Sequence, residues 1–435
     1  MLRYYLQLAW RSLRRHPVMS GLMVLAIGLG IGASMTMLTV LHVMDADPLP
    51  GRSAQLFRPY LNPLPRSYTN NGLGPDPSIN LTWPDAMALL QAGKGAQQAA
   101  MAGTRALVMP GGNRRPFRAQ GRMTTRGFFA MFGLHFVDGA SWSSADGSSA
   151  AQVVVISQGL ARRVFGSNQV VGRSLHLDSH DYRVVGVVRD WAPRPMFYVD
   201  DSAQRYKGAD DYFVPLSTAV SLGLRVSGNQ SGWGKDGIGP KSATMSWLQF
   251  WVQLDTPVQV AAYRRFLHNY AAQQKAAGRF ERSPEKAARL YSLMGWLAAR
   301  HIVPGDVSMQ AGLAMAFLLV CLVNIVALLL AKFLRRAGEI SVRRALGARR
   351  RDIFAQFCIE SAAVGVLGGA LGLLLAELGL WSVRQRPDDY AHLAQMDVGM
   401  LGLTIAAAVV ASLCAGVLPA WRAARVAPAL QLKAL

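Results

Sequence analysis

The chain has 435 residues, of which 51% are hydrophobic and 16% are charged. That charged share lies well below the roughly 25% usual in soluble domains, which argues against a wholly soluble protein and favours a few membrane spans with one sizeable soluble region. The net charge of +21 raises nucleic acid as a partner, but the densest basic cluster flanks apolar segments, as membrane orientation requires, so we expect no nucleic-acid partner.

Residues 1–16 are predicted to form an amphipathic helix. Leu6, Trp10 and Leu13 recur at three- and four-residue steps, while Arg3 and Arg11 take the opposite face. Such a helix is expected to lie among the lipid headgroups on the cytoplasmic side. A solvated helical start is the alternative.

Residues 17–44 contain no charged side chain and exceed the ~20 residues that a membrane span needs. A signal peptide has a shorter apolar core of about 7 to 15 residues, so this segment is predicted to be an uncleaved first transmembrane helix. Gly28 and Gly32 form a pair of small residues that would let another helix approach closely. The alternative is that lipid merely tolerates them.

Residues 45–308 are predicted to be a large soluble α+β domain of two subdomains. Thr82 is placed to cap a helix with Asp85 at the capping-box position, and Ser157 to cap another after a short β-branched strand. A hairpin is expected around Asp178-Ser179-His180. The stretch through Pro77 is predicted to be turn-rich, and residues 202–241 to be a long loop. Further along, a strand is expected over 247–254 and a long helix over 258–277.

Three more apolar segments follow, so four transmembrane helices are predicted in all. The basic residues gather before the first segment, between the second and third, and after the last, which places both termini in the cytoplasm and the large domain outside the membrane. The expected protein is therefore a multi-pass membrane protein, with its α+β domain inserted between helices 1 and 2. The other spans are expected at 309–331, 353–380 and 398–418. They are separated by a basic cytoplasmic loop at 332–352 and a short outer loop at 381–397, and a cytoplasmic tail follows at 419–435.

No pattern in the sequence predicts catalysis, a metal site or a bound cofactor. The nearest approach to a phosphate-binding loop, residues 228–236, is one residue too long and has Asp236 in place of the hydroxyl that binds magnesium. His176, Asp178 and His180 alternate, but the hairpin turn between them favours an ordinary polar turn. Glu360 lies within a span, near the basic loop, and could pair with an arginine there.

The basic loop carries the clearest motif of the chain. Residues 339–348, read with Arg351-Asp352-Ile353 and Glu360-Ser361, resemble the signature of FtsX-like permeases, the membrane subunits of MacB-type ABC systems. Residues 418–428 are similar to that family's end, and segments between 128 and 188 resemble its periplasmic core domain.

The resemblance implies that the loop is a coupling helix seated on an ABC ATP-binding subunit, which would carry the ATP and magnesium. A loop that only orients the spans is the alternative. The residues implied in ATPase coupling are Glu339, Ile340, Val342, Arg343, Arg344, Leu346, Gly347 and Ala348.

The resemblance also implies partners, a mechanism and a location: the bacterial inner membrane, with the large domain and the loop at 381–397 in the periplasm. Four glycines of the third span, Gly365, Gly368, Gly369 and Gly372, would let it pack closely, as a dimer with a second copy or a paralogue needs. ATPase motion would reach the periplasmic domain and export or extract an antibiotic, peptide or lipoprotein, with membrane lipid and a periplasmic adaptor as further partners. The alternative is a signalling or scaffold protein that passes this motion to a periplasmic partner without moving a solute.

Overall fold

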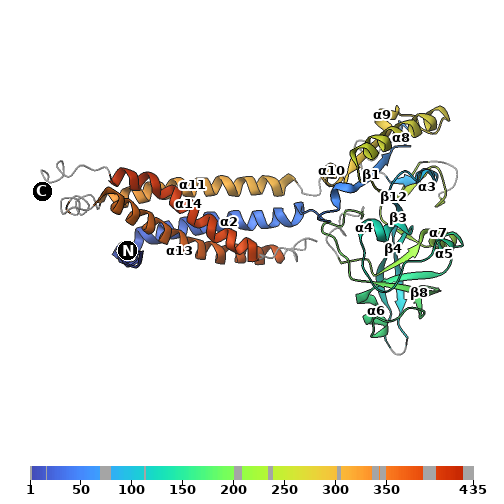
Figure 1. The fold of residues 1–435 in the computed structure, drawn as a ribbon, viewed down its shortest axis with the longest axis horizontal. Coiled ribbons are helices and arrows are strands. Elements are labelled where there is room, and N and C mark those ends of the chain that lie inside the picture. Colours follow the sequence, from blue (N-terminus) through green and yellow to red (C-terminus); the bar gives the residue numbers. More distant parts are fainter. Residues whose placement is uncertain are drawn as a thin grey trace. The chain divides into compact units, whose positions relative to one another are not determined.

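The computed structural model describes residues 2–15, 17–68, 80–111, 114–199, 208–233, 239–300, 305–335, 342, 349–385 and 398–424. The chain forms two compact units (Figure 1). We call them the helical unit (Met1–Asp45 and Val303–Leu435) and the sheet unit (Ala46–Ile302).

The helical unit is a bundle in which α13 packs along both α2 and α14, α11 packs along α2, and α1 packs against α13. Ile27, Ile31 and Met35 of α2 recur every four residues, so they form one buried stripe, which joins a core with Ile325 and Leu329 of α11. The helix bounds are α1 Leu2–Arg15, α2 Pro17–Asp45, α11 Gly305–Arg335, α13 Arg350–Arg384 and α14 Val398–Ala424.

Within the described residues, three helices are long and apolar enough to cross a membrane: Pro17–Asp45, Met309–Lys332 and Arg350–Arg384. They contain the first three predicted spans. The apolar stretch of α14, Leu401–Val417, is shorter. The fourth predicted span, and with it the count of four, stays a prediction.

The sheet unit is built on one mixed sheet, which in the described part of the chain has the strand order β13-β1-β12-β3-β4-β9-β6-β8-β5. The pairs β4–β9 and β6–β8 are parallel, whereas β3–β4 and β1–β13 are antiparallel. The strand bounds are β1 Leu56–Leu61, β2 Leu81–Thr82, β3 Gln97–Met109, β4 Phe117–Thr124, β5 Phe136–Gly139, β6 Val153–Ser157, β7 Ser174–Leu177, β8 His180–Val188, β9 Tyr212–Pro215, β10 Val226–Ser227, β11 Ser231–Gly232, β12 Met245–Gln253 and β13 Ala288–Ser292.

Helices cover this sheet and make the unit α+β, as the sequence predicts. The region forms one compact unit, and the expected division into two subdomains stays a prediction. The helix bounds are η1 Ser53–Gln55, α3 Trp83–Ala92, α4 Gly127–Phe132, α5 Ser144–Ser148, α6 Gln158–Phe165, α7 Leu216–Ser221, α8 Pro257–Ala276, α9 Pro284–Ala287 and α10 Leu293–Ala299.

An aromatic cluster anchors the short helix α4 in the sheet unit. The ring centroids of Phe128 and Phe132 lie 4.9 Å apart at 87°, an edge-to-face contact. Phe132 also meets Trp251 of β12, and Phe128 meets Phe213 of β9. This helix therefore ties strands from two distant parts of the chain to one core.

Several local predictions are confirmed. The Thr82 hydroxyl accepts a hydrogen bond from the backbone N–H of Asp85 at the start of α3, and the Ser157 hydroxyl accepts one from Leu160 at the start of α6. The strand expected over 247–254 is β12, and the long helix after it is α8. The expected hairpin is β7–β8, where Asp178 turns the chain with a φ of +52°.

Two predictions about irregular regions are wrong. Residues 202–241 are not one long loop, because they contain β9 and α7, and all four residues of β9 are buried. The turn-rich stretch through Pro77 contains β1, which is also fully buried. In both places a short apolar strand lies between polar, Gly- or Pro-rich segments, and the average composition hides it.

Candidate functional site

A lysine and a glutamate form a buried ion pair inside the helical unit. The Nζ of Lys332 lies 2.6 Å from the Oε1 of Glu360, and both side chains are 1% exposed. Lys332 lies in the last turn of α11, and Glu360 lies about three turns into α13. The pair therefore joins α11 to α13. We call the residues between these two helices, 336–349, the α11–α13 connection.

Two hydroxyl groups complete this polar cluster. Ser12 of α1 donates a hydrogen bond to the Oε1 of Glu360, and the Lys332 ammonium donates to the Oγ of Ser20 in α2 at 3.4 Å. A buried charge pair is tolerated only when its remaining lone pairs and protons are also satisfied. Four helices thus meet at this pair, which we call the Lys332–Glu360 cluster.

From the sequence, Glu360 could pair with an arginine of the basic loop. The structure pairs Glu360 with Lys332, at the start of that loop. Arg343 and Arg344 lie outside the described residues, so a pairing with one of them stays a prediction. The flexible four-carbon stem of a lysine can run along apolar surface and return its ammonium to a buried carboxylate. The available signal was a lone lysine at the edge of an apolar run. Ser12 and Ser20 carry no comparable signal.

The predicted coupling residues fall largely outside the described residues. Val342 is described and is 52% exposed. α13 begins at Arg350, and the Asp352 carboxylate accepts a hydrogen bond from the backbone N–H of Arg349 at 3.3 Å. The predicted residues that lie outside are Glu339, Ile340, Arg343, Arg344, Leu346, Gly347 and Ala348. Their coupling role stays a prediction.

Glycines set the distance between α2 and α13. A Cβ added to Gly28 would lie 2.8 Å from the side chain of Leu371, and one added to Gly32 would lie 2.8 Å from Leu375. From the other helix, a Cβ on Gly368 would lie 2.5 Å from Ile27. These separations are too short for a real side chain, so α2 and α13 approach as closely as they do because these residues are glycines.

The other glycines of α13 meet α2 and α14. A Cβ on Gly365 would lie 2.1 Å from the Ser412 hydroxyl, and one on Gly369 would lie 2.9 Å from Ala408, both on α14. Gly372 faces Ile31 of α2 at 3.1 Å. All six predicted packing glycines therefore lie at contacts between helices of this chain. Their role in packing two copies together as a dimer stays a prediction.

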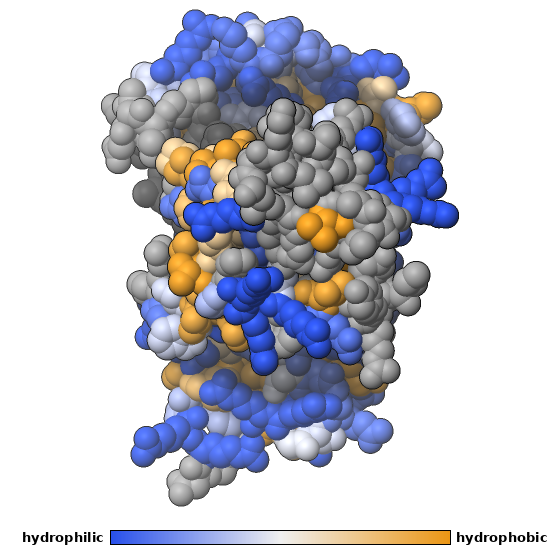
Figure 2. Space-filling view, turned by 90° about the vertical axis from the view of Figure 1, so that its left-hand side faces the viewer, coloured by the Kyte–Doolittle hydropathy of each residue, from blue (hydrophilic) through white to orange (hydrophobic). Residues whose placement is uncertain are grey.

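The exposed face of α1 is basic. Arg11, Arg14 and Arg15 are exposed, whereas Ser12 and Leu13 are buried. Figure 2 faces the end of the helical unit where α1 lies and shows hydrophilic surface in blue beside hydrophobic surface in orange. Such a surface suits the lipid headgroup region, and the interfacial position of α1 remains an expectation.

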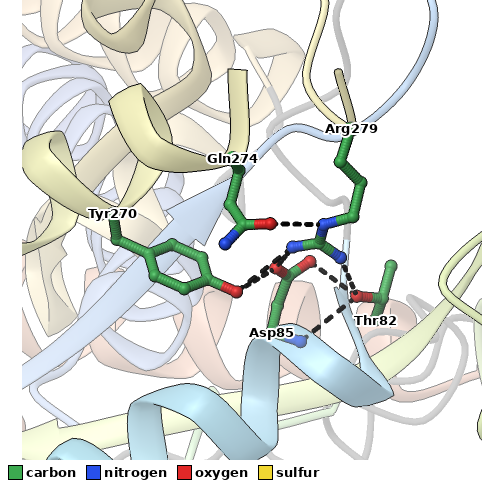
Figure 3. Close-up of polar contacts among 5 residues, drawn as sticks. All are labelled: Thr82, Asp85, Tyr270, Gln274 and Arg279. Atoms are coloured by element: carbon green, nitrogen blue, oxygen red, sulfur yellow. Dashed lines mark hydrogen bonds and ion pairs between the residues drawn. The ribbon is translucent and has the colours of Figure 1, made fainter. Parts of the chain in front are cut away.

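A second buried polar cluster lies in the sheet unit and joins α3 to α8 (Figure 3). The Asp85 carboxylate is fully buried, forms an ion pair with Arg279, and accepts a hydrogen bond from the Tyr270 hydroxyl at 2.7 Å. Burial raises the pKa of the Tyr270 phenol, and the neighbouring Asp85 charge raises it further. Gln274 accepts from the Arg279 Nε at 2.7 Å. Each of the five residues drawn contacts at least one of the others, which is typical of a structural cluster.

The remaining polar patterns flagged by the sequence are also paired. The Nδ1 of His176 lies 3.0 Å from the Oδ1 of Asp181, directly across the β7–β8 hairpin. Asp178 accepts a hydrogen bond from the backbone N–H of Leu107 at 2.8 Å. Glu377 pairs with Arg384 at 2.6 Å on α13, with the carboxylate 53% exposed.

Comparison with known families accounts for both units. The model of the MacB-like periplasmic core domain matches residues 20–269, which is more than half of the chain. The model of the FtsX-like permease C-terminal region matches residues 311–428. The chain belongs to the MacB/FtsX-like permease family. The Lys332–Glu360 pair lies within the FtsX-like region, and the Asp85 carboxylate lies within the MacB-like region.

Named relatives of this permease are similar over almost all of its length. It is 25% identical over 433 residues to the macrolide export ATP-binding/permease protein MacB 1/2 of Paracoccus denitrificans, covering 98% of this chain and 58% of that protein. It is also 25% identical over 435 residues to the pyoverdine export ATP-binding/permease protein PvdT of Pseudomonas entomophila, covering 97% of this chain and 58% of that protein. The permease chain thus spans less than two thirds of the length of these relatives.

Among solved structures, the periplasmic region of MacB from Actinobacillus actinomycetemcomitans matches this permease with a TM-score of 0.38 and 15% identity, over 57% of this chain and 94% of that one.

Proposed function

We propose that this chain is the membrane subunit of a MacB/FtsX-type ABC transporter. It would couple ATP hydrolysis on a separate ATP-binding subunit to motion of the sheet unit, and so export or extract a substrate. Support comes from the two family matches and from relatives whose names describe export of a macrolide and of pyoverdine. The substrate class we propose is an antibiotic, a peptide or a lipoprotein.

The observation that carries this proposal is the Lys332–Glu360 cluster. Its two charged residues flank the α11–α13 connection, which holds the proposed ATPase contact. Breaking a buried ion pair by separating its partners costs several kcal/mol, so the two helices are held together at this point. A displacement of the connection would therefore move α11 and α13 as one body, and α2 and α1 with them through the serine contacts.

The proposed arrangement in the membrane has four spans, with α14 as the fourth. Both termini and the α11–α13 connection would lie in the cytoplasm, and the sheet unit in the periplasm of a bacterium with the chain in its inner membrane. The exposed arginines of α1 and the arginines that flank the connection support this orientation, because basic residues favour the cytoplasmic side.

The proposed partners follow from the same mechanism. ATP and magnesium would bind to the ATP-binding subunit, and this chain would supply no ligand to either. A second copy or a paralogue would complete the transporter, because an ABC transporter works with two ATP-binding subunits. A periplasmic adaptor and membrane lipid are further proposed partners.

The proposal is tested by charge reversal in the connection. Arg343→Glu/Arg344→Glu is expected to abolish co-purification with the ATP-binding subunit encoded nearest to this chain, because the reversed charges would repel acidic groups that accept these arginines. Membrane insertion should remain normal, as judged by the amount of protein in the membrane fraction. The matched control is Arg264→Glu/Arg265→Glu, which reverses two exposed charges on α8.

Wild-type complex formation by the Arg343→Glu/Arg344→Glu variant would show that the connection serves only to orient the spans. Reconstitution of the wild-type complex then separates transport from signalling. A transporter should hydrolyse ATP faster when its substrate is added, whereas a scaffold should respond to its periplasmic protein partner and not to a solute.

A further inference from the structure

The long strand β3 has three partner strands in turn along one edge, and at Leu107 the hairpin residue Asp178 meets its backbone. Along this edge β12 pairs with residues 97–101, β10 with Gly103 and Thr104, and β7 with Val108 and Met109. Between β10 and β7, no strand of the described chain pairs with Arg105–Leu107 on this side. The change of partner along one strand therefore opens a gap in the sheet.

A groove of about 720 Å³ lies at this gap. Its size falls within the range of roughly 300–1,000 Å³ that is usual for small-molecule sites. It is lined by residues 105–107 of β3, Arg118 of β4, the hairpin turn 178–180 and residues 222–227, which lead from α7 into β10.

Three arginines give the groove a positive charge. Arg118 lies directly opposite Leu107 in the β3–β4 register, and Arg105 lies opposite Gln120, so these side chains share one face of the sheet. Arg225 approaches from the segment after α7. Within the described residues, neither Arg118 nor Arg225 has a carboxylate at ion-pair distance. Their guanidinium groups are therefore available to an anionic ligand.

Two other charged side chains of the groove already have partners. The Arg105 Nε donates to Gln120 at 3.2 Å, and Asp178 accepts from the backbone N–H of Leu107. Asp178 is the one carboxylate among the lining residues, set against three guanidinium groups. The groove is thus electrostatically unbalanced in favour of an anion.

Apolar side chains lie among these charges. Leu107 is 36% exposed and lines the groove together with Arg105 and Arg118. Leu222, Leu224 and Val226 are half-buried and line the groove from the α7 side. A bare inorganic anion would leave this apolar surface in water. A ligand that combines an anionic group with an apolar body would cover both kinds of surface.

We propose that this groove binds an anionic amphiphile, a molecule that carries a phosphate or carboxylate on a short apolar chain. Arg118 and Arg225 bind the anionic group through charge-assisted hydrogen bonds, and Leu107 with the leucines of the 222–227 segment contacts the chain. This site goes beyond the proposed transport function and needs no ATPase. A negative result in the binding experiment would therefore leave the proposed transport function untouched.

The test uses the full chain in nanodiscs of phosphatidylcholine, titrated with octyl phosphate by calorimetry against empty nanodiscs. Wild type is expected to bind saturably, and Arg118→Gln/Arg225→Gln to bind at least about tenfold more weakly, because each charge-assisted contact is worth roughly a factor of ten or more. The control Arg264→Gln/Arg265→Gln should stay within about twofold of wild type, since it removes two exposed arginines outside the groove. An unchanged melting temperature of each variant establishes that it is folded.

The apolar part of the proposal is tested separately. Leu107→Ser should weaken octyl phosphate binding and leave inorganic phosphate binding unchanged, and neutral octanol should bind far more weakly than octyl phosphate. Equal binding by the Arg118→Gln/Arg225→Gln variant, equal binding of octanol, or no saturable binding at all would overturn the proposal.

A last arm identifies the source of the amphiphile. Phosphatidylglycerol replaces part of the nanodisc lipid, and octyl phosphate is titrated again. Weaker binding would support the proposal with a membrane lipid as occupant, because the lipid competes for the groove. Unchanged binding would support it with a dissolved amphiphile as occupant.

Discussion

Lys332 and Glu360 bring two opposite charges into the interior of a largely apolar bundle. Each charge alone would lose several kcal/mol of hydration, and their attraction offsets that loss only while they remain in contact. Asp85 and Arg279 follow the same rule in the sheet unit, where Tyr270 and Thr82 satisfy further hydrogen bonds. At both places the contact between two buried opposite charges fixes the position of one helix against another.

Removing one member of the Lys332–Glu360 pair is expected to cost more than removing both. Glu360→Gln or Lys332→Met should lower the free energy of unfolding by about 3–5 kcal/mol, because each removes the opposite charge from a buried ionised group. The double variant Lys332→Met/Glu360→Met should be less destabilised than either single variant, and so far less than the sum of the two. The measurement is the temperature at which half of the detergent-solubilised protein is lost from its size-exclusion peak.

The control for this cycle is Glu377→Gln, which removes the partly exposed partner of Arg384 and should cost no more than about 1 kcal/mol. Strictly additive losses in the double variant would contradict a coupled buried pair.

At the scale of elements, the sequence predicts what is encoded locally. The caps of α3 and α6 and the β7–β8 hairpin rest on residues within a few positions of one another, such as Thr82 with Asp85. The contact of Lys332 with Glu360 depends on how two helices are rotated about their axes, which composition does not reveal. Likewise β9 is buried because β4 and β6 flank it. Its four residues alone are too few for a strand to be predicted there.

Small residues determine how closely α2, α13 and α14 pack. At Gly32 the nearest atoms to an added Cβ include the backbone oxygen of Gly372 at 3.1 Å, and at Gly365 they include that of Ala408 at 3.1 Å. Backbone cannot move aside as the end of a flexible side chain can. Substitution at these two positions must therefore push whole helices apart.

Gly32→Ala and Gly365→Ala are each expected to lower stability by about 1–3 kcal/mol, the usual cost of overpacking a tight contact. Gly21→Ala is the matched control, because it lies in α2 with no atom within 4 Å of the added Cβ and should be neutral or slightly stabilising. The same heating assay measures all three variants. A loss at Gly21 equal to that at Gly32 would show that helix packing is not the cause.

At the scale of the whole molecule, the chain order places the sheet unit after α2 and before α11. The side of the membrane on which it lies then depends on α2, and the side of the C-terminus depends on whether α14 crosses. The apolar stretch Leu401–Val417 is at the short end of the roughly 17–25 residues that a span needs, although α14 as a whole is 27 residues long. The fourth span is thus the decisive feature of the topology.

We expect α14 to cross the membrane and return the C-terminus to the cytoplasm. The starting variant has Cys321, Cys358 and Cys414 replaced by alanine. Four variants of it then carry one new cysteine each. The first two are Ser144→Cys in α5 and Gln385→Cys after α13, and the last two are Arg350→Cys at the start of α13 and a cysteine added after Leu435. In intact spheroplasts an impermeant maleimide should label the first two, and should label the last two only after lysis. Labelling of the added C-terminal cysteine before lysis, with the other three sites as expected, would mean that only three helices cross, since the chain would then end on the same side as Gln385.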